Sequence, residues 1–128
     1  WDNNQQIMGY LSPRLDVNND GTPDGPVSLD FLNKKLNLIN AWTVYGEEGS
    51  YHTIHRHNEK HHPHLATVIY LKVPKKEPGD FTYILNESYN FITPKEGDIF
   101  VFPIHMIHGT YPQGKGLRQT LNLDFEIL

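Results

Sequence analysis

Two histidines separated by one residue, His55 and His57, are the side chains in this sequence best placed to bind a metal ion. Alternate residues of a β-strand point to the same face, so a strand through this segment places both imidazoles on one surface. Neutral imidazole is a good ligand for Zn, Cu, Fe and Ni. Two ligands rarely complete a metal site, and His108 is the candidate for the third. The sequence therefore predicts a centre at which His55, His57 and His108 meet.

The remaining five of the eight histidines are weaker candidates for ligands. On a regular strand His52 faces away from the pair, and His105 lies three residues before His108, so both are expected to pack against the site or support it. A polar loop, for which simple solvation is the alternative, carries His61, His62 and His64. Glu59 is the alternative source of a carboxylate ligand, although its spacing does not suit a regular strand.

Composition excludes several kinds of site. The 128 residues include no cysteine, which excludes disulfides, thiolate metal sites and a cysteine nucleophile. A net charge of −4 gives no reason to expect binding to nucleic acid or to an anionic membrane. No apolar run approaches the ~20 residues that span a bilayer, and no signal peptide opens the chain, so the cytoplasm is the expected location. The chain begins at Trp1 and is read as processed or trimmed, and its oligomeric state stays open.

Short strands are expected to dominate the chain from about residue 31 onward. Runs rich in β-branched and aromatic residues alternate with turn residues such as those at 46–49 and 95–98. About seven or eight short strands are expected, and six of them can be placed, at 36–45, 50–57, 66–73, 81–85, 99–102 and 117–127. Little helix is expected, so a single domain over residues 1–128 is predicted to be an antiparallel sandwich or barrel.

The first 30 residues are expected to be largely irregular, with a short capped helix starting near Ser28. Oxygen ligands recur around Gly21 as they do in the first part of a calcium-binding loop, at Asp16, Asn18, Asp20 and Asp24. Val27 stands where a bidentate Glu would close such a site. The alternative is a solvated turn without calcium.

The last expected strand alternates strictly between apolar and polar residues. Its polar face carries Arg118, whose planar guanidinium suits fork-like binding of a carboxylate. Thr120 and Asn122 share that face and can add hydrogen bonds. We expect the Arg118 side chain to point into the barrel, on the same side as Thr120. The alternative is a solvated residue on an amphipathic edge strand.

The spacing of glycines, prolines and histidines resembles the two cupin motifs of the double-stranded β-helix, a jelly-roll barrel with its metal inside the mouth. The start of the first motif is matched by Gly49, His55 and His57. The frame of the second motif is matched by Gly97, Pro103 and His108. The sequence departs from cupins where His61 or His62 replaces a Glu and where His105 replaces a Gly.

A closer resemblance is to the iron(II)/2-oxoglutarate-dependent oxygenases, which share this fold. The ordered matches span about residues 42–125 and are Trp42, Gly49, His55-Arg-His57, Val68-Ile-Tyr-Leu71, Gly97-Asp98, Phe102-Pro103, His108, Pro112 and Arg118-Gln-Thr120. The resemblance implies a hydroxylase with Fe(II), or another divalent metal, on His55, His57 and His108. It also implies 2-oxoglutarate as cosubstrate, held by Arg118 with Thr120, Asn122 and Tyr70, and a small-molecule or peptide substrate. No catalytic residue is expected beyond the metal ligands.

One departure leaves two other functions open. Most of these oxygenases use two His and one carboxylate, whereas His57 here replaces the carboxylate. The second hypothesis is therefore a cupin-type metal-binding protein or a three-histidine dioxygenase that does not use 2-oxoglutarate. The third is a non-enzymatic jelly roll with incidental histidines. Arg118 favours the oxygenase, since ordinary cupins do not require it. Trp42 and Phe102 are expected to be walls of the core or pocket.

Overall fold

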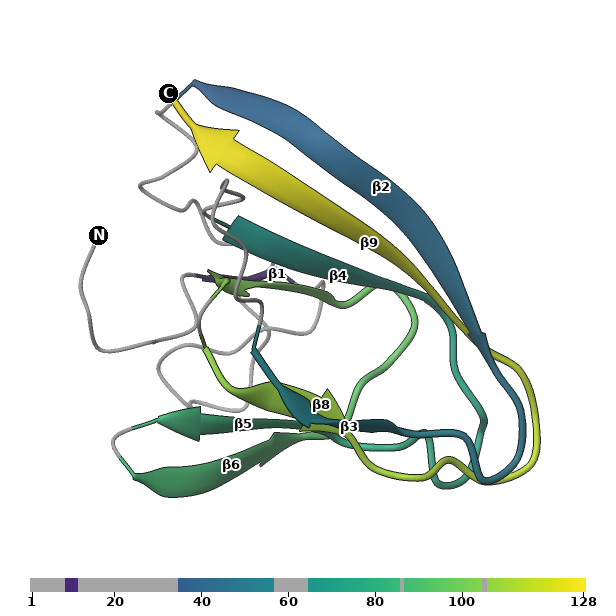
Figure 1. Cartoon of the computed structure of the whole chain (residues 1–128). Coiled ribbons are helices and arrows are strands. Elements are labelled where there is room, and N and C mark those ends of the chain that lie inside the picture. Colours follow the sequence, from purple (N-terminus) through teal and green to yellow (C-terminus); the bar gives the residue numbers. More distant parts are fainter. Residues whose placement is uncertain (1–8, 12–34, 57–64, 86, 105) are drawn as a thin grey trace, which may run out of the picture.

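Two antiparallel sheets face each other in the computed structural model, which describes residues 9–11, 35–56, 65–85, 87–104 and 106–128 (Figure 1). In sheet order, the five-stranded sheet contains β1 (Gly9–Leu11), β7 (Ile99–Pro103), β4 (Leu65–Lys72), β9 (Arg118–Ile127) and β2 (Leu36–Gly46). The four-stranded sheet contains β3 (His52–His55), β8 (His108–Thr110), β5 (Phe81–Leu85) and β6 (Ser88–Ile92).

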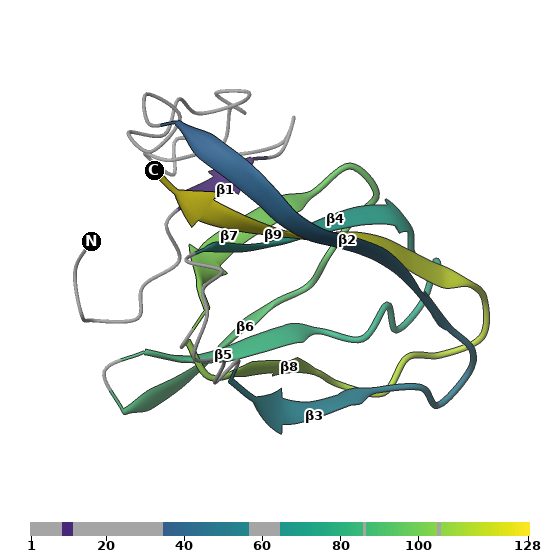
Figure 2. The same ribbon diagram turned by 45° about the horizontal axis from the view of Figure 1, so that its top comes forward.

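The chain crosses repeatedly from one sheet to the other (Figures 1 and 2). From β2 onward each connection changes sheet, except the hairpin between β5 and β6. This alternation is the path of a double-stranded β-helix, so the predicted all-β jelly-roll class is confirmed. Within the described ranges, no helix is long and apolar enough to cross a membrane.

All six strands that the sequence placed are present, with ends shifted by a few residues at most. The described residues contain three further short strands that the sequence did not place: β1, β6 and β8. β1 lies within the segment expected to be irregular, where it pairs with β7. The helix expected near Ser28 and the calcium loop at Asp16, Asn18, Asp20 and Asp24 lie outside the described residues.

Aromatic side chains form the core between the sheets. Tyr70 and Phe100 from the large sheet and Phe81 from the small sheet are each exposed by 1% or less. The Phe81 ring centre lies 5.0 Å from that of Phe100 and 5.4 Å from that of Phe102, both tilted contacts that suit aromatic pairs. This packing fills one part of the space between the two sheets. Polar residues line the remaining part.

The polar face of β9 is the buried one. Arg118, Thr120 and Asn122 are at most 9% exposed, whereas the alternating apolar residues of β9 are only half-buried. β9 pairs with β4 on one side and with β2 on the other, so it is an inner strand of its sheet. The prediction that Arg118 points into the barrel is confirmed, and the alternative of a solvated edge-strand residue is wrong.

Candidate metal and cosubstrate site

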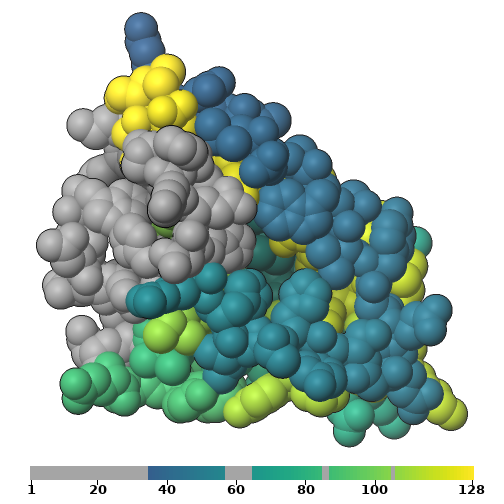
Figure 3. Space-filling model, in the orientation of Figure 1, coloured from purple at the N-terminus to yellow at the C-terminus, as the bar shows by residue number. Residues whose placement is uncertain are grey.

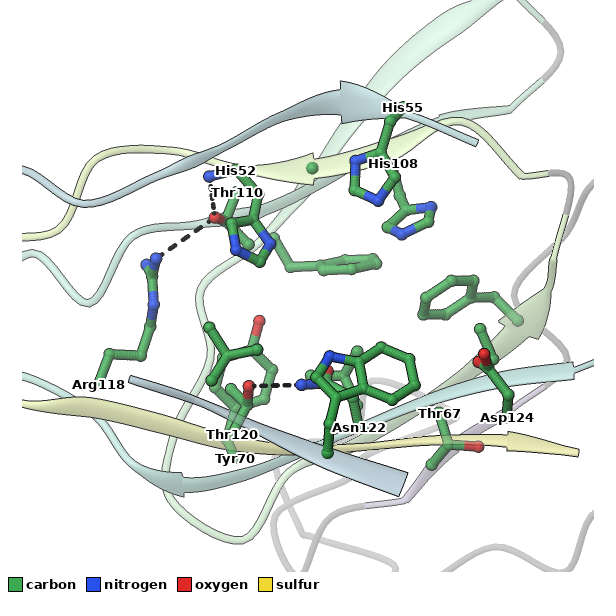
Figure 4. Close-up of a pocket in the computed structure, with 17 residues that line it drawn as sticks. His52, His55, Thr67, Tyr70, His108, Thr110, Arg118, Thr120, Asn122 and Asp124 are labelled. Carbon is green, nitrogen blue, oxygen red and sulfur yellow. Dashed lines mark hydrogen bonds between the residues drawn. The ribbon is translucent and has the colours of Figure 1, made fainter. Parts of the chain in front are cut away.

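A cavity of about 240 Å³ lies between the two sheets and is lined by both of them (Figure 4). The small sheet contributes His52, His55 and His108, and the large sheet contributes Arg118 and Tyr70. Trp42 and Val44 of β2 also line the cavity, which agrees with the expectation that Trp42 is a pocket wall. Atoms of β9 are visible between β2 and β3 in the space-filling view, so the cavity is not sealed between these two edge strands (Figure 3).

His55 and His108 are direct cross-strand neighbours, because β3 and β8 pair antiparallel in the register His55↔His108. Their ring centres lie 4.5 Å apart with an angle of 55° between the planes. Two imidazoles that bind one metal at about 2.1 Å and at right angles to each other bring their ring centres to about 4.5 Å. The spacing of the two rings therefore fits adjacent positions on one metal ion.

Each of these rings is held by a backbone carbonyl. The Nδ1 of His55 lies 2.7 Å from the Thr53 carbonyl oxygen, and the Nδ1 of His108 lies 2.8 Å from that of Met106. A carbonyl only accepts, so Nδ1 carries the proton and Nε2 carries the lone pair in each neutral ring. This orientation is common for histidine ligands, since the second hydrogen bond fixes the tautomer and the ring plane.

The expectation that His52 faces away from His55 is wrong. β3 carries a bulge, because His52 pairs with Thr110 while His55 pairs with His108, three residues on one strand against two on the other. The extra residue brings His52 and His55 to the same face, with ring centres 6.4 Å apart, and both line the cavity. Gly109 permits this approach, since a Cβ there would lie 2.9 Å from the His52 carbonyl oxygen.

The third predicted ligand, His57, lies outside the described residues, as do Glu59, His61, His62, His64 and His105. Among the residues that are described, no three His, Asp or Glu side chains form a group that could hold a metal. The structure thus brings together His55 and His108 of the predicted set. Whether His57 completes the set stays a prediction.

Arg118 reaches the cavity from β9 and is only 6% exposed. Its Nη1 donates to the Pro78 carbonyl at 3.0 Å and to the Tyr111 carbonyl at 3.4 Å. Its Nη2 lies 3.4 Å from the Ser50 carbonyl and 3.3 Å from Thr110 Oγ1. Burial lowers the pKa of the guanidinium, but an arginine stays protonated in proteins. Within the described part of the chain, none of its hydrogen-bond acceptors is a carboxylate, so these contacts leave its charge unneutralised.

Tyr70 presents a buried hydroxyl to the same region. The side chain is 1% exposed, and the hydroxyl has no hydrogen-bond partner among the described residues. Burial raises the pKa of Tyr70 and so keeps it a neutral donor, while the nearby Arg118 charge acts in the opposite direction. The turn at Gly97-Asp98 fixes the strand at this point, since Tyr70 N donates to the Asp98 carbonyl at 2.9 Å and Gly97 N to the Tyr70 carbonyl at 2.8 Å.

Thr120 and Asn122 lie on the cavity face of β9, as predicted, and the Asn122 Nδ2 donates to Thr120 Oγ1 at 3.1 Å. Three other polar lining residues, Thr67, Thr110 and Asp124, were not predicted as site residues. Strand alternation was the signal for the last two: Thr110 follows His108 by two residues, and Asp124 follows Asn122 by two.

Comparison with solved structures finds the same fold in several oxygenases. An oxidoreductase of the 2OG-Fe(II) oxygenase family from Burkholderia pseudomallei superposes with a TM-score of 0.65 at 14% identity, over 73% of this chain and 46% of that one. A Pseudomonas putida prolyl-4-hydroxylase gives a TM-score of 0.61 at 19% identity, over 75% and 55%. The viral collagen prolyl hydroxylase of Paramecium Bursaria Chlorella virus-1, in its 2OG complex, gives 0.58 at 18%, over 73% and 62%.

These likenesses establish the fold. The chain has the double-stranded β-helix of the 2-oxoglutarate oxygenases, and it spans between 46% and 62% of the length of the three proteins named above. No protein-family model matches the sequence, and no curated protein sequence matches it either.

Proposed function

We propose that this chain is an Fe(II)- and 2-oxoglutarate-dependent oxygenase that hydroxylates a small molecule or a peptide. The observation that carries the proposal is a buried arginine, Arg118, in the same cavity as the His55 and His108 pair. A buried charge is costly unless an opposite charge compensates it. A dicarboxylate that binds the metal at one end and Arg118 at the other would supply that compensation.

His55 and His108 would hold the metal through Nε2, with His57 as the third ligand. The metal supplies redox chemistry and a binding site for the cosubstrate and oxygen when it is bound. The protein's own part is positional. Arg118 orients the far carboxylate, and Tyr70 donates its hydroxyl proton to the same group. Thr120 and Asn122 add polar contacts along β9. The cavity volume of about 240 Å³ lies close to the lower end of ligand pockets, about 300 Å³, and suits a small diacid.

Turnover of 2-oxoglutarate to succinate by the Fe(II)-loaded protein tests this proposal. The wild-type chain should form succinate, and Arg118→Lys should raise the KM for 2-oxoglutarate because a point charge cannot reproduce the fork. Arg118→Ala should weaken binding by about 2–5 kcal/mol, the usual cost of removing one partner of a buried charge pair. Iron binding should survive in both variants.

Arg56→Ala is the matched control, because Arg56 is an exposed arginine directly after β3 that does not line the cavity. It should leave the KM unchanged. Iron binding without any dependence on 2-oxoglutarate would contradict the proposal and favour a three-histidine dioxygenase or a cupin-type metal-binding protein. Failure to bind iron at all would favour the non-enzymatic jelly roll.

A further inference from the structure

The hydroxyl of Thr110 lies at the junction between the predicted cosubstrate anchor and the strand that carries His55. Thr110 Oγ1 accepts the backbone N–H of His52 at 3.0 Å and an Nη2–H of Arg118 at 3.3 Å. Figure 4 shows both contacts converging on this oxygen at the wall of the cavity. One atom therefore joins β3, β8 and the guanidinium carried by β9.

A hydroxyl offers two acceptor lone pairs and one proton. His52 and Arg118 occupy both lone pairs of Thr110 Oγ1, so the proton is the only group that remains for another partner. Among the described residues no acceptor for that proton lies within hydrogen-bond distance. The hydroxyl faces a cavity that also contains the buried Tyr70 hydroxyl, which likewise lacks a partner within the described residues.

From this arrangement we propose that Thr110 is a positioning and recognition residue for the anionic end of the ligand. It fixes the guanidinium of Arg118 against β3 and donates its own proton to the carboxylate that the charge of Arg118 attracts. The inference rests on the proposed function in naming 2-oxoglutarate as the source of that carboxylate. The link between Arg118 and β3 does not depend on any ligand.

The link has a structural consequence for the site. β3 is an edge strand and carries a bulge, so its ladder to β8 is interrupted between His52 and His55. The contact to Thr110 secures the backbone N–H of His52 just before the bulge. Loss of the hydroxyl should therefore loosen Arg118 and β3 together.

Two substitutions separate the hydroxyl from the shape of the side chain. Thr110→Val keeps the branched shape and removes the oxygen, whereas Thr110→Ser keeps the oxygen. Thr82→Val is the matched control, because Thr82 on neighbouring β5 is 1% exposed, its hydroxyl has no partner among the described residues, and it does not line the cavity. It makes the same chemical change and removes no hydrogen bond.

Calorimetric titration of 2-oxoglutarate into the Fe(II)-loaded chain without oxygen measures the affinity to which Thr110 is proposed to contribute. Thr110→Val should weaken binding about tenfold to a hundredfold, the range expected for lost hydrogen bonds to a charged group. Thr110→Ser should restore binding to within a few-fold, and Thr82→Val should match the wild type. Iron affinity should stay unchanged in Thr110→Ser and Thr82→Val. Wild-type affinity in Thr110→Val, or no recovery in Thr110→Ser, would overturn the recognition role.

A second readout on the metal-free chain tests the link by itself. The guanidinium ¹⁵N–¹H signal of Arg118, identified by its absence in Arg118→Lys, should shift in Thr110→Val and stay in place in Thr82→Val. An unmoved signal in Thr110→Val would overturn the positioning role. If wild-type protein fails to bind 2-oxoglutarate, the proposed function and the recognition role both fail, and the guanidinium signal alone then decides whether Thr110 positions Arg118.

Discussion

Tyr70→Phe should stabilise the metal-free protein and weaken its binding of 2-oxoglutarate. The hydroxyl oxygen of Tyr70 is buried and has no hydrogen-bond partner within the described residues. Leaving such a group buried without a partner costs about 1–3 kcal/mol, and removing it recovers part of that cost. The aromatic contact with Phe100, at 5.3 Å between ring centres, does not depend on the hydroxyl and should remain.

The size of both effects follows from these contacts. A gain of about 1 kcal/mol should raise the Tm of a domain of this length by about 3–6 °C. The lost hydrogen bond to a carboxylate should lower the affinity for 2-oxoglutarate about tenfold to a hundredfold. Stability and affinity should change in opposite directions, because the unpaired Tyr70 hydroxyl destabilises the free protein and forms its hydrogen bond only with the ligand.

Thermal unfolding of the metal-free chain and calorimetry of the Fe(II)-loaded chain measure the two effects. Tyr83→Phe is the control, since Tyr83 is a half-buried tyrosine on β5 that does not line the cavity. Tyr83→Phe should not combine a higher Tm with a weaker affinity for 2-oxoglutarate. A lower Tm for Tyr70→Phe, or an unchanged affinity for 2-oxoglutarate, would refute the reasoning about this hydroxyl.

Three further outcomes are expected. His108→Ala should abolish stoichiometric Fe(II) binding measured by elemental analysis, and retained iron would exclude it as a ligand. Gly79→Ala should destabilise the fold by at least about 1–2 kcal/mol in urea unfolding, because φ is +81° and the added Cβ would meet Arg118 Nη1 and the Tyr111 carbonyl. Burial lowers the pKa of His52 below 6.5 in the folded chain. The unfolded chain therefore binds a proton at His52 more readily, and the free energy of unfolding should fall as pH falls below about 6.5. The decrease in the free energy of urea unfolding at acid pH should be smaller in His52→Gln than in the wild type. An equal decrease would contradict this assignment.

Much of the fold was predictable because strand alternation and turn residues are local signals. The run at 66–73 and the alternating run at 117–127 became β4 and β9 with nearly the expected ends. The short strands β6 and β8 were missed since three to five residues carry little periodicity of their own. They exist because neighbouring strands offer them hydrogen bonds, which a single sequence does not reveal.

The site was predictable to the extent that it follows regular alternation. Arg118 and Thr120 face the cavity as expected, and His55 meets His108. His52 was placed on the wrong face because the β3 bulge depends on pairing with β8 and on the small size of Gly109, both of which lie more than 50 residues away in sequence.

We propose that one cavity holds both Fe(II) and 2-oxoglutarate. Visible absorption of the wild-type chain, without oxygen and with Fe(II) and 2-oxoglutarate added in turn, tests it most directly. A charge-transfer band that appears only when both are present, and that is lost in His55→Ala, is the predicted result. Stoichiometric Fe(II) binding with no band at saturating 2-oxoglutarate would contradict the claim.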